Sequence, residues 1–320
     1  MRRRQAESSE SDAMRTGRVL AVDVGGTKLA AGVVTSDGEV LAEAKTATGV
    51  PGAGGGETLF ARLERLCRDA LDDATVAVDA IGVGCGGPMR YPDGVVSPLH
   101  IPAWREFPLR ERFVRAFGHP CVVDNDAKAV ALGEWWRGAG RGKRHLLGMV
   151  VSTGVGGGLI VDGRLVQGAH GHAGHIGHVN VAREGVRCEC GARGCVSAYA
   201  SGTGLSRRYR DETGAARSAA EIAELARHGD ELAMRLYAEA GDALGRGIAS
   251  VEALCDLEIA IVGGSVALRA WDLLGPPLEA SLRASAQFEF TRDIQVVPAQ
   301  LGERAGLLGA ACLALGEHSE

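Results

Sequence analysis

The sequence predicts an α/β protein of two domains, and three observations support this. The chain has 320 residues, which is long enough for two hydrophobic cores. A strand, a glycine-rich turn and a second strand begin at Arg18, and the same pattern returns from Leu146 onward. Elsewhere, short β-branched runs alternate with stretches whose apolar residues recur at helical spacing. We therefore expect two α/β domains, each with a β-hairpin that ends in a glycine-rich tip.

The first hairpin joins strands 18–24 and 29–34. Its turn consists of Gly25, Gly26, Thr27 and Lys28. The two glycines let backbone N–H groups approach an anion closely, and Thr27 and Lys28 add a hydroxyl and a positive charge. Asp23, just before the turn, is placed to hold a hydrated Mg²⁺ beside such an anion. An ordinary tight hairpin would also explain the two glycines, so both interpretations stay open for this motif alone.

The second hairpin joins strands 146–151 and 159–161 through the glycine-rich turn 152–158. Two such tips in two domains would offer N–H groups to phosphate across a cleft, so the repeat favours phosphate binding. A third glycine pair, Gly263-Gly264, follows the buried strand 257–262 and precedes a helix. That arrangement fits the adenosine end of a nucleotide.

Asn125 and Asp126 stand between strand 120–123 and the helix that begins at Ala127. Asn and Asp are common N-caps, which is one explanation for the pair. The other is that one side chain caps the helix while the other carboxylate faces a substrate as a general base. The residues alone leave both open.

The remaining elements follow from spacing and capping signals. A helix is expected over 57–74, a short strand over 81–84, a long loop over 91–108 and a short helix over 110–117. In the second half, helices are expected to begin near Ser201, at the capping box of Ser218 and at Asp230. A last strand is expected over 294–297 and a last helix over 302–315.

A metal site is indicated by Cys188, Cys190 and Cys195. Three thiolates and one imidazole form a tetrahedral Cys₃His zinc site, and His178 is the histidine nearest to these cysteines in sequence. A disulfide or simple buried thiols are the alternatives. Four protein ligands would close the coordination shell, so the metal is expected to be structural.

Composition excludes several classes of function. The formal net charge is −5 and no basic stripe is present, which argues against nucleic acid as a partner. No apolar run approaches the about 20 residues of a membrane span. Eight cysteines without an apolar signal segment suggest a reducing, cytoplasmic compartment and metal binding. Residues 1–17 are polar and are expected to form a disordered tail.

Together and in this order, these motifs resemble those of the ROK (repressor, ORF, kinase) family of sugar kinases. The matching segments are AVDVGGTK (21–28), VDNDAKAVALGE (123–134), the glycine- and histidine-rich run 152–179, CECGARGCVSAYASG (188–202) and IVGGS (261–265). The resemblance covers residues 18 to 315. It implies an α/β, actin-like ATPase (ribonuclease H-like) fold with two domains flanking an ATP/sugar cleft. The small domain would span 18–123 and be completed by helix 302–316, and the large domain would span 124–301.

The resemblance also implies a role for each matching residue. The first phosphate loop would contain Asp23, Gly25, Gly26, Thr27 and Lys28, with Asp23 near Mg²⁺. The second phosphate loop would contain Thr153, Gly154 and Gly156, and adenosine would lie against Gly263 and Gly264. Asn125 would hold a sugar hydroxyl and Asp126 would be the general base. Zinc would be bound by His178, Cys188, Cys190 and Cys195, so ATP with Mg²⁺ and structural Zn²⁺ are the expected cofactors.

The acceptor-binding residues depart from the usual family pattern. His100 stands where Asn is usual, His175 replaces the common Glu of the G-E-x-G-H run, and Ser197 replaces the Glu that usually follows Gly-Cys-x. Gly87, like Asn125, is also expected to lie beside the acceptor. A carboxylate accepts two hydroxyl protons, whereas neutral His and Ser accept fewer, so plain glucose should bind weakly. Because His175 and Ser197 lie next to His178 and Cys195, zinc would position two acceptor-binding segments.

The leading hypothesis is therefore an ATP-dependent kinase that phosphorylates a hydroxyl of a hexose or hexose-like acceptor. N-acetylmannosamine and C7-cyclitols are alternative acceptors to glucose. A non-catalytic, sugar-sensing regulator is the hypothesis from a different class, although no basic recognition helix precedes the first strand. The family resemblance also suggests a homodimer.

Overall fold

A computed structural model describes residues 17–49 and 55–316 of the chain. Apart from Gly17, the expected N-terminal tail lies outside these residues. The described chain divides into two compact units. The first contains the chain up to Arg137, residues 167–172 and the chain from Glu303 onward. The second contains residues 138–166 and 173–302.

A five-stranded sheet forms the centre of the first unit, with strand order β3-β2-β1-β4-β7. Its strands are β1 (Arg18–Val24), β2 (Lys28–Thr35), β3 (Val40–Ala47), β4 (Ala80–Cys85) and β7 (Cys121–Asn125). β1 pairs antiparallel with β2 and parallel with β4, which confirms the predicted first hairpin. β4 pairs parallel with β7, so the ends of β1, β4 and β7 reach the same edge of the sheet.

The second unit repeats this arrangement, with strand order β10-β9-β8-β11-β12. Its strands are β8 (Leu146–Val151), β9 (Val155–Val161), β10 (Arg164–Leu165), β11 (Ile259–Gly263) and β12 (Gln295–Pro298). Again the hairpin, β8 with β9, is antiparallel, while β11 pairs parallel with β8 and β12. The internal repeat predicted from the two glycine-rich turns is therefore present in the fold.

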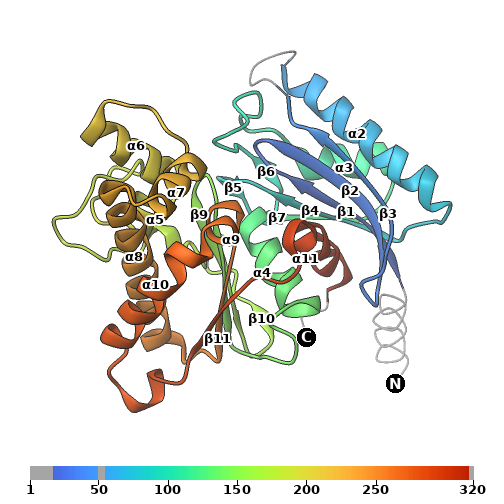
Figure 1. The fold of residues 1–320 in the computed structure, drawn as a ribbon. Helices are drawn as coiled ribbons and strands as arrows, with labels where there is room; N and C mark the ends of the chain where they lie inside the picture. Colours follow the sequence, from blue (N-terminus) through green and yellow to red (C-terminus); the bar gives the residue numbers. More distant parts are fainter. Residues whose placement is uncertain (1–16, 50–54, 317–320) are drawn as a thin grey trace. The chain divides into compact units, whose positions relative to one another are not determined.

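Helices cover the first sheet on both faces (Figure 1). They are α2 (Gly55–Ala74), α3 (Leu109–Phe117), α4 (Asp126–Arg137) and α11 (Ala305–Leu315). α2 packs on β2 and β3, and α11 packs on β1, β4 and α4. α11 is buried along its whole length, because its residues are almost all apolar or small. This packing on α11 keeps α4 in the first unit, whereas the sequence interpretation began the large domain at residue 124.

The helices of the second unit begin where capping residues indicate. They are α5 (Val196–Ala200), α6 (Gly202–Thr213), α7 (Ala219–Arg227), α8 (Glu231–Cys255), α9 (Ser265–Arg269) and α10 (Trp271–Ser285). Ser201, Ser218 and Asp230 each accept a backbone N–H at the start of α6, α7 and α8. Leu244 and Ile248 of α8 join the same apolar cluster as Met149 of β8.

The long loop 91–108 contains more structure than expected. Two short strands, β5 (Met89–Arg90) and β6 (Val95–Val96), pair at its start. Arg105 donates to the carbonyl oxygens of Pro98, Ile101 and Trp104, at 2.9, 3.2 and 2.8 Å. The loop therefore has a fixed conformation built on hydrogen bonds from one guanidinium.

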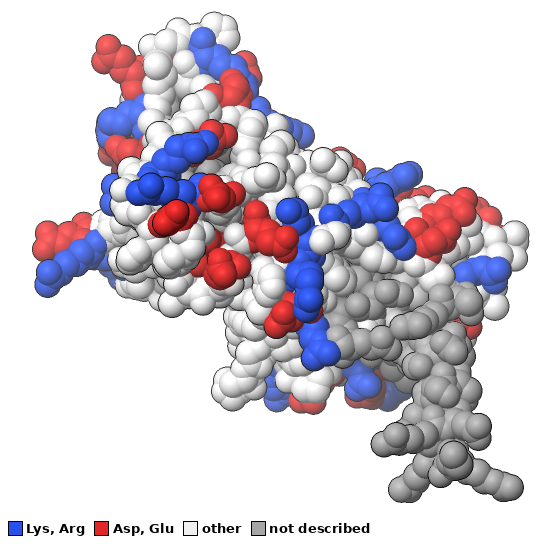
Figure 2. Space-filling view, turned by 90° about the horizontal axis from the view of Figure 1, so that it is seen from below, with Lys and Arg blue, Asp and Glu red and all other residues white. Residues whose placement is uncertain are grey.

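Charges on the described surface are mixed. Figure 2 shows acidic and basic side chains side by side in small groups on one face. Ion pairs at i,i+4 spacing on helices, such as Arg68 with Glu64 and Arg246 with Asp242, are among the charge pairs of the described residues. Within the described residues, the helices are all too short or too polar to span a membrane.

Candidate functional site

The first hairpin tip exposes backbone amides. The amide of Gly25 donates to the carbonyl of Lys28 at 3.0 Å and closes the turn. Within the described residues, the next two amides, of Gly26 and Thr27, have no hydrogen-bond partner. The Thr48 hydroxyl donates to the Gly25 carbonyl at 2.8 Å and helps to fix the conformation of the tip. Two free N–H groups on a fixed turn form an anion-binding concavity.

Lys28 follows this tip, and its ammonium lies 3.0 Å from the carboxylate of Glu303. Lys45 lies 3.5 Å from the same carboxylate. Glu303 is largely exposed, so an arriving anion can compete with it for Lys28.

Asp23 is enclosed at the end of β1. A Cβ on Gly306 of α11 would lie 2.7 Å from a carboxylate oxygen of Asp23, so only glycine leaves room there. Burial, reinforced by the negative charge of Asp126, raises the pKa of Asp23 to about 7, while Lys28 opposes the shift. Two carboxylates that disfavour each other's charge form a place where a cation is stabilised.

Asn125 and Asp126 lie where β7 ends and α4 begins. The Asn125 side-chain oxygen accepts the Ala127 amide at 3.0 Å, and Asp126 accepts the same amide at 2.9 Å. Positions for a Cβ on Gly86 and Gly87 lie 3.7 Å from Asp126 Oδ2 and 3.6 Å from Asn125 Nδ2. Both side chains are therefore fixed at the helix entrance, beside a short run of residues without side chains.

His100 approaches the first tip from the long loop. A Cβ on Gly26 would lie only 2.6 Å from the Cβ of His100, so the loop and the tip are in close contact. The His100 side chain is exposed. Asp23, Asn125, Asp126, Gly87 and His100 thus all belong to the first unit.

The second hairpin tip is shorter than the sequence suggested. The turn covers only Ser152–Gly154, because β9 begins at Val155 and Gly156 pairs with Val150 in the sheet. Placing Gly156 in the turn was therefore wrong. Gly157 explains the glycine run in β9: a Cβ there would lie 2.6 Å from the Gly148 carbonyl oxygen and 2.9 Å from Ile176.

Thr153 and Gly154 form the part of this tip that can bind an anion. Within the described residues, their amides have no hydrogen-bond partner. The Thr203 amide and hydroxyl donate to the Thr153 carbonyl, at 3.2 and 3.1 Å, and hold the start of α6 on the turn. The Ser152 hydroxyl lies 2.9 Å from that of Ser265, the first residue of α9.

A pocket of about 350 Å³ lies beside the second tip, within the second unit. This volume lies within the roughly 300–1,000 Å³ of small-molecule sites. Its polar lining includes Thr153, Ser206, Ser218, Ser265 and Arg269. Gly263 and Gly264 do not line the pocket themselves; the residues that follow them, Ser265 and Val266, do.

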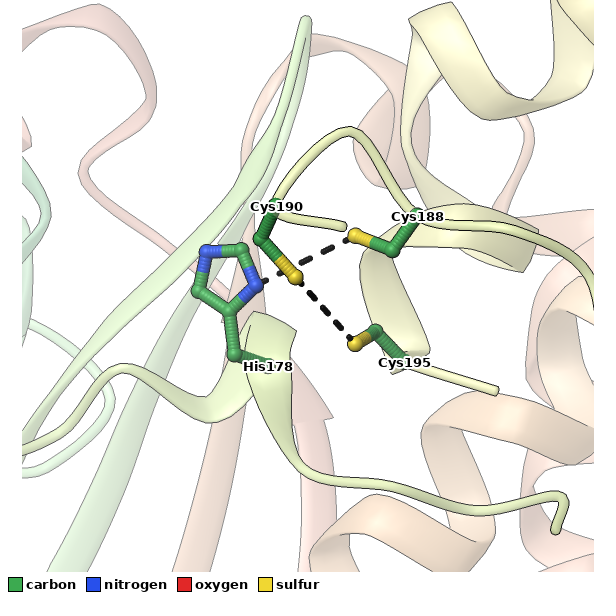
Figure 3. Close-up of side chains that lie close together, drawn as sticks. All are labelled: His178, Cys188, Cys190 and Cys195. Atoms are coloured by element: carbon green, nitrogen blue, oxygen red, sulfur yellow. Dashed lines mark hydrogen bonds between the residues drawn. The ribbon is translucent and has the colours of Figure 1, made fainter. Parts of the chain in front are cut away.

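The predicted metal ligands converge. Figure 3 shows His178, Cys188, Cys190 and Cys195 with their donor atoms turned toward one point. These atoms all lie within 4.8 Å of one another. Cys190 Sγ lies 3.8 Å from Cys195 Sγ, and Cys188 Sγ lies 4.0 Å from His178 Nδ1. Around zinc with Zn–S bonds of about 2.3 Å, neighbouring sulfurs stand roughly 3.8 Å apart, so the donor set fits.

The cysteine loop is held independently of any metal. The Tyr199 hydroxyl accepts the Val186 amide at 3.1 Å, and Arg207 donates to the Arg187 carbonyl at 2.7 Å. All three cysteines are free thiols rather than a disulfide. Burial raises the pKa of Cys195 to about 12, so without a bound cation this sulfur is a thiol at neutral pH.

A model of the ROK family matches residues 19–317. This chain belongs to the ROK family. The N-acetylmannosamine kinase of Yersinia pseudotuberculosis is 35% identical over 92% of this chain and 97% of its own length. Two solved ROK structures are also similar. A hexokinase from Thermus thermophilus is 36% identical, with 93% of this chain and 97% of that chain covered and a TM-score of 0.85.

The other is a glucokinase from Streptomyces griseus in complex with glucose and AMPPNP. It is 34% identical, with 93% of this chain and 99% of that chain covered and a TM-score of 0.74. The two similar units described above are accordingly the two domains of the actin-like ATPase fold.

His175 and Ser197, two of the positions expected to depart from the family pattern, lie close in sequence to the cluster of His178, Cys188, Cys190 and Cys195. His175 precedes the short 3₁₀ turn Ile176–His178, and its ring stacks at 6.5 Å on that of His178. Ser197 lies in the first turn of α5, two residues after Cys195, which is the N-cap of this helix. His178 and His175 therefore lie on one short element, and Cys195 and Ser197 lie on another.

Several residues of the site were not identified from the sequence. Thr48 supports the first tip from 23 positions away, and Ser206, Arg269 and Tyr237 line the pocket. Their partners are distant in sequence, so spacing carries no signal for them. Ser218 was identified only as a helix cap, although it also lines the pocket.

Proposed function

We propose that this chain is an ATP-dependent sugar kinase in which Asp126 takes the proton from the acceptor hydroxyl and Asn125 holds the acceptor. The observation that carries this is the Asn125–Asp126 junction beside Asp23, in a chain of the ROK family. The relatives named above as sugar kinases align with this chain over more than nine tenths of both chains, and they support the kinase class.

Phosphoryl transfer depends mainly on positioning and on neutralising charge, and the described residues suit both. The free amides of Gly26 and Thr27, and those of Thr153 and Gly154, would donate to phosphate oxygens. Lys28 would leave Glu303 and add a positive charge. Removing the acceptor proton through Asp126 makes the hydroxyl a better nucleophile.

Mg²⁺ would be held through water by Asp23. The raised pKa of Asp23 reflects an environment in which its charge lacks compensation, and a cation supplies that compensation. When bound, Mg²⁺ neutralises charge on the phosphates. The chain's own contribution is to place the Asp23 carboxylate rigidly against α11.

The adenosine end of ATP would occupy the pocket beside the second tip. That pocket adjoins Thr153, so phosphate on the tip and a nucleoside in the pocket would be neighbours. Ser206 and Ser218 offer hydroxyls to a ribose or base, and Arg269 offers a planar cation to stack on a base.

Structural zinc would be bound by His178, Cys188, Cys190 and Cys195. The supporting observation is the convergence of one imidazole and three thiols with sulfur spacing that suits a tetrahedral ion. The ion would act through position, by fixing the elements that carry His175 and Ser197.

The acceptor is proposed to be a hexose-like molecule other than plain glucose. The family resemblance assigns acceptor contacts to His100, His175 and Ser197, and none of these is a carboxylate. N-acetylmannosamine and C7-cyclitols are the acceptors we favour. A homodimer and a cytoplasmic location are expected from the family and from the free thiols.

A panel of acceptors tests the proposal. ADP release with Mg-ATP would be measured for glucose, mannose, N-acetylglucosamine, N-acetylmannosamine and a C7-cyclitol. We expect turnover with at least one hexose-like acceptor, and a higher kcat/KM for it than for glucose. Equal or better activity on glucose would contradict the acceptor assignment, and no phosphorylated product with any of them would contradict the kinase itself.

A further inference from the structure

Lys128 is a charged residue that the proposed chemistry does not use. Its side chain is fully buried, and it lies in the first turn of α4, two residues after Asp126. Both features oppose a cation, because burial removes hydration and a helix N-terminus is electrostatically positive. An apolar side chain would fill the same space at lower cost, so the ammonium group itself has a use.

Three polar groups surround this ammonium. Lys128 Nζ donates to the side-chain oxygen of Gln167 at 2.6 Å and to the carbonyl of Gly171 at 2.8 Å, and Asp124 Oδ1 lies 3.6 Å away. The Gln167 amide in turn donates to Asp124 Oδ2 at 2.8 Å. Lys128 therefore makes two hydrogen bonds and an ion pair, and both oxygens of Asp124 accept hydrogen bonds.

The same network reaches the transfer site. Asp124 Oδ1 accepts the backbone amide of Asn125 at 2.7 Å. Asn125 and Asp126 follow directly in the chain, so the network contacts the junction from the strand side through Asp124 and from the helix side through Lys128.

The other end of the network anchors residues 167–172, the short segment that returns to the first unit. A Cβ on Gly171 would lie 2.3 Å from the Cβ of Tyr91, so this segment is confined between α4 and the long loop. The Tyr91 ring also lies 5.9 Å from Lys128 Nζ. The chain leaves the first unit after His172, three residues before His175.

We infer that Lys128 is a positioning residue for phosphoryl transfer, which clamps residues 167–172 to the Asn125–Asp126 junction and so fixes the acceptor relative to Asp126. The inference rests on the proposed function. It assigns the clamp to acceptor geometry and not to ATP binding, because the hydrogen bonds and ion pair that the described residues show for Lys128, Asp124 and Gln167 lead to the Asn125–Asp126 junction and to residues 167–172.

Three variants test the clamp. Lys128→Met removes the charge and keeps the length of the side chain. Gln167→Leu breaks the bridge without removing a charge, and Asp124→Asn/Lys128→Met removes both charges together. Lys143→Met is the matched control, since Lys143 lies 3.6 Å from Glu258 in the second unit, away from the clamp.

Steady-state kinetics with N-acetylmannosamine and glucose as probes give the first readout. For Lys128→Met and Gln167→Leu, we expect acceptor kcat/KM to fall about tenfold or more, with acceptor KM raised and ATP KM within about twofold of wild type. The double variant should recover part of the Lys128→Met loss, because it leaves no unpaired buried charge. A role in stability alone would reduce kcat with the folded fraction and leave both KM values unchanged, and that result would overturn the inference.

Amide hydrogen exchange gives a second readout that needs no activity. Peptides covering 123–128 and 167–175 should exchange faster in both single variants, while the control matches wild type. Unchanged exchange in these peptides would overturn the clamp. If Lys128→Met fails to fold, Gln167→Leu and the double variant decide the question. Wild-type protein inactive on every acceptor of the panel would count against the proposed function, and the exchange data would still decide the clamp.

Discussion

Asp126 is the residue on which the proposed chemistry depends most directly. Its carboxylate is fixed at the first position of α4, where it accepts the Ala127 amide. Asp126→Asn keeps this shape and removes the base. We expect kcat to fall by about 10²–10⁴-fold while AMPPNP binding, measured by calorimetry, stays unchanged. Turnover near that of wild type would show that another group takes the proton.

Asp23 makes a prediction about pH because burial and Asp126 raise its pKa to about 7. A raised carboxylate pKa means that the folded state favours the protonated form. Protonated Asp23 stabilises the folded state fully below the ordinary carboxyl pKa of about 4. This stabilisation is lost as the pH rises through about 7. In metal-free protein, the stability of Asp23→Asn relative to wild type should therefore increase from about pH 4 to about pH 7, by at most about 4 kcal/mol, and stay level above that.

Chemical denaturation across this pH range measures that difference. Asp37→Asn serves as the control, because a hydrogen bond from Thr35 lowers the pKa of Asp37 and places its titration below the range. Added Mg²⁺ should reduce the gain, since a cation stabilises the charged Asp23. A difference between wild type and Asp23→Asn that stays constant with pH would contradict the raised pKa.

At the residue scale, the sequence indicates candidate catalytic and metal-binding residues more readily than the residues that hold them in position. Asp126 and the four predicted metal ligands could be proposed from the sequence because their spacing or position is local. Lys128 could not be assigned, because its partners Gln167 and Gly171 are 39 and 43 positions away. Nothing in a helical pattern distinguishes a buried lysine from an exposed one.

At the scale of elements, the loop that carries Cys188, Cys190 and Cys195 is the segment most open to test. Cys190 is the exposed cysteine of the predicted donor set, so Cys190→Ser removes a donor without disturbing the core. We expect purified wild type to contain zinc by mass spectrometry. Losing a residue that only hydrogen-bonds to a metal ligand typically weakens metal binding by roughly 10–100-fold. Cys190→Ser removes a direct donor, so its zinc affinity should fall by more than this, and its melting temperature should fall as well.

The acceptor KM of Cys190→Ser should also rise, because the same elements carry His175 and Ser197. Cys255→Ser is the control, since this half-buried cysteine ends α8 outside the cluster. Protein that is fully active and equally stable after complete removal of metal would contradict a structural role for zinc.

α7 offers a second prediction at this scale. Ser218 forms a complete capping box with Glu221 and also lines the pocket. Ser218→Ala should cost about 1 kcal/mol of stability and raise the KM for ATP. Ser250→Ala removes an exposed hydroxyl of α8 and should change neither the stability nor the KM for ATP. A loss of stability without any change in ATP KM would limit Ser218 to capping.

Elements with local signals were predicted well, and those fixed by tertiary packing were not. Both hairpins and the capped starts of α6, α7 and α8 follow from turns and caps. β9 begins earlier than its glycines suggested, because the sheet and Ile176 require small residues there. α10 contains Pro276 and Pro277, which favour a break, yet packing on α8 maintains the helix.

At the scale of the whole molecule, the repeat of one strand order in two units was predictable, but the boundary between the units was not. The boundary depends on α4 packing against α11, and these helices are far apart in sequence. The return of residues 167–172 to the first unit likewise depends on Lys128 and Asp124. Turn signals cannot reveal such contacts.

Nucleotide binding is the prediction that involves the whole molecule, because free amides occur at a hairpin tip in each unit. AMPPNP with Mg²⁺ at about 100 times its Kd should stabilise the folded chain by about 2.7 kcal/mol. Lys28→Met in the first unit and Arg269→Ala in the second should each reduce this stabilisation at the same ligand concentration. Asp126→Asn should retain it, since the base acts on the acceptor.

The control is Arg68→Ala. Arg68 lines a separate hollow of about 580 Å³ in the first unit, beside Asp72 and His119, to which no part of ATP is assigned. The thermal shift caused by AMPPNP should therefore be the same in Arg68→Ala and wild type. If Arg68→Ala reduced the shift and Arg269→Ala did not, the nucleoside would belong in the hollow of the first unit. The shared strand order would then reflect common architecture without a shared role in holding ATP.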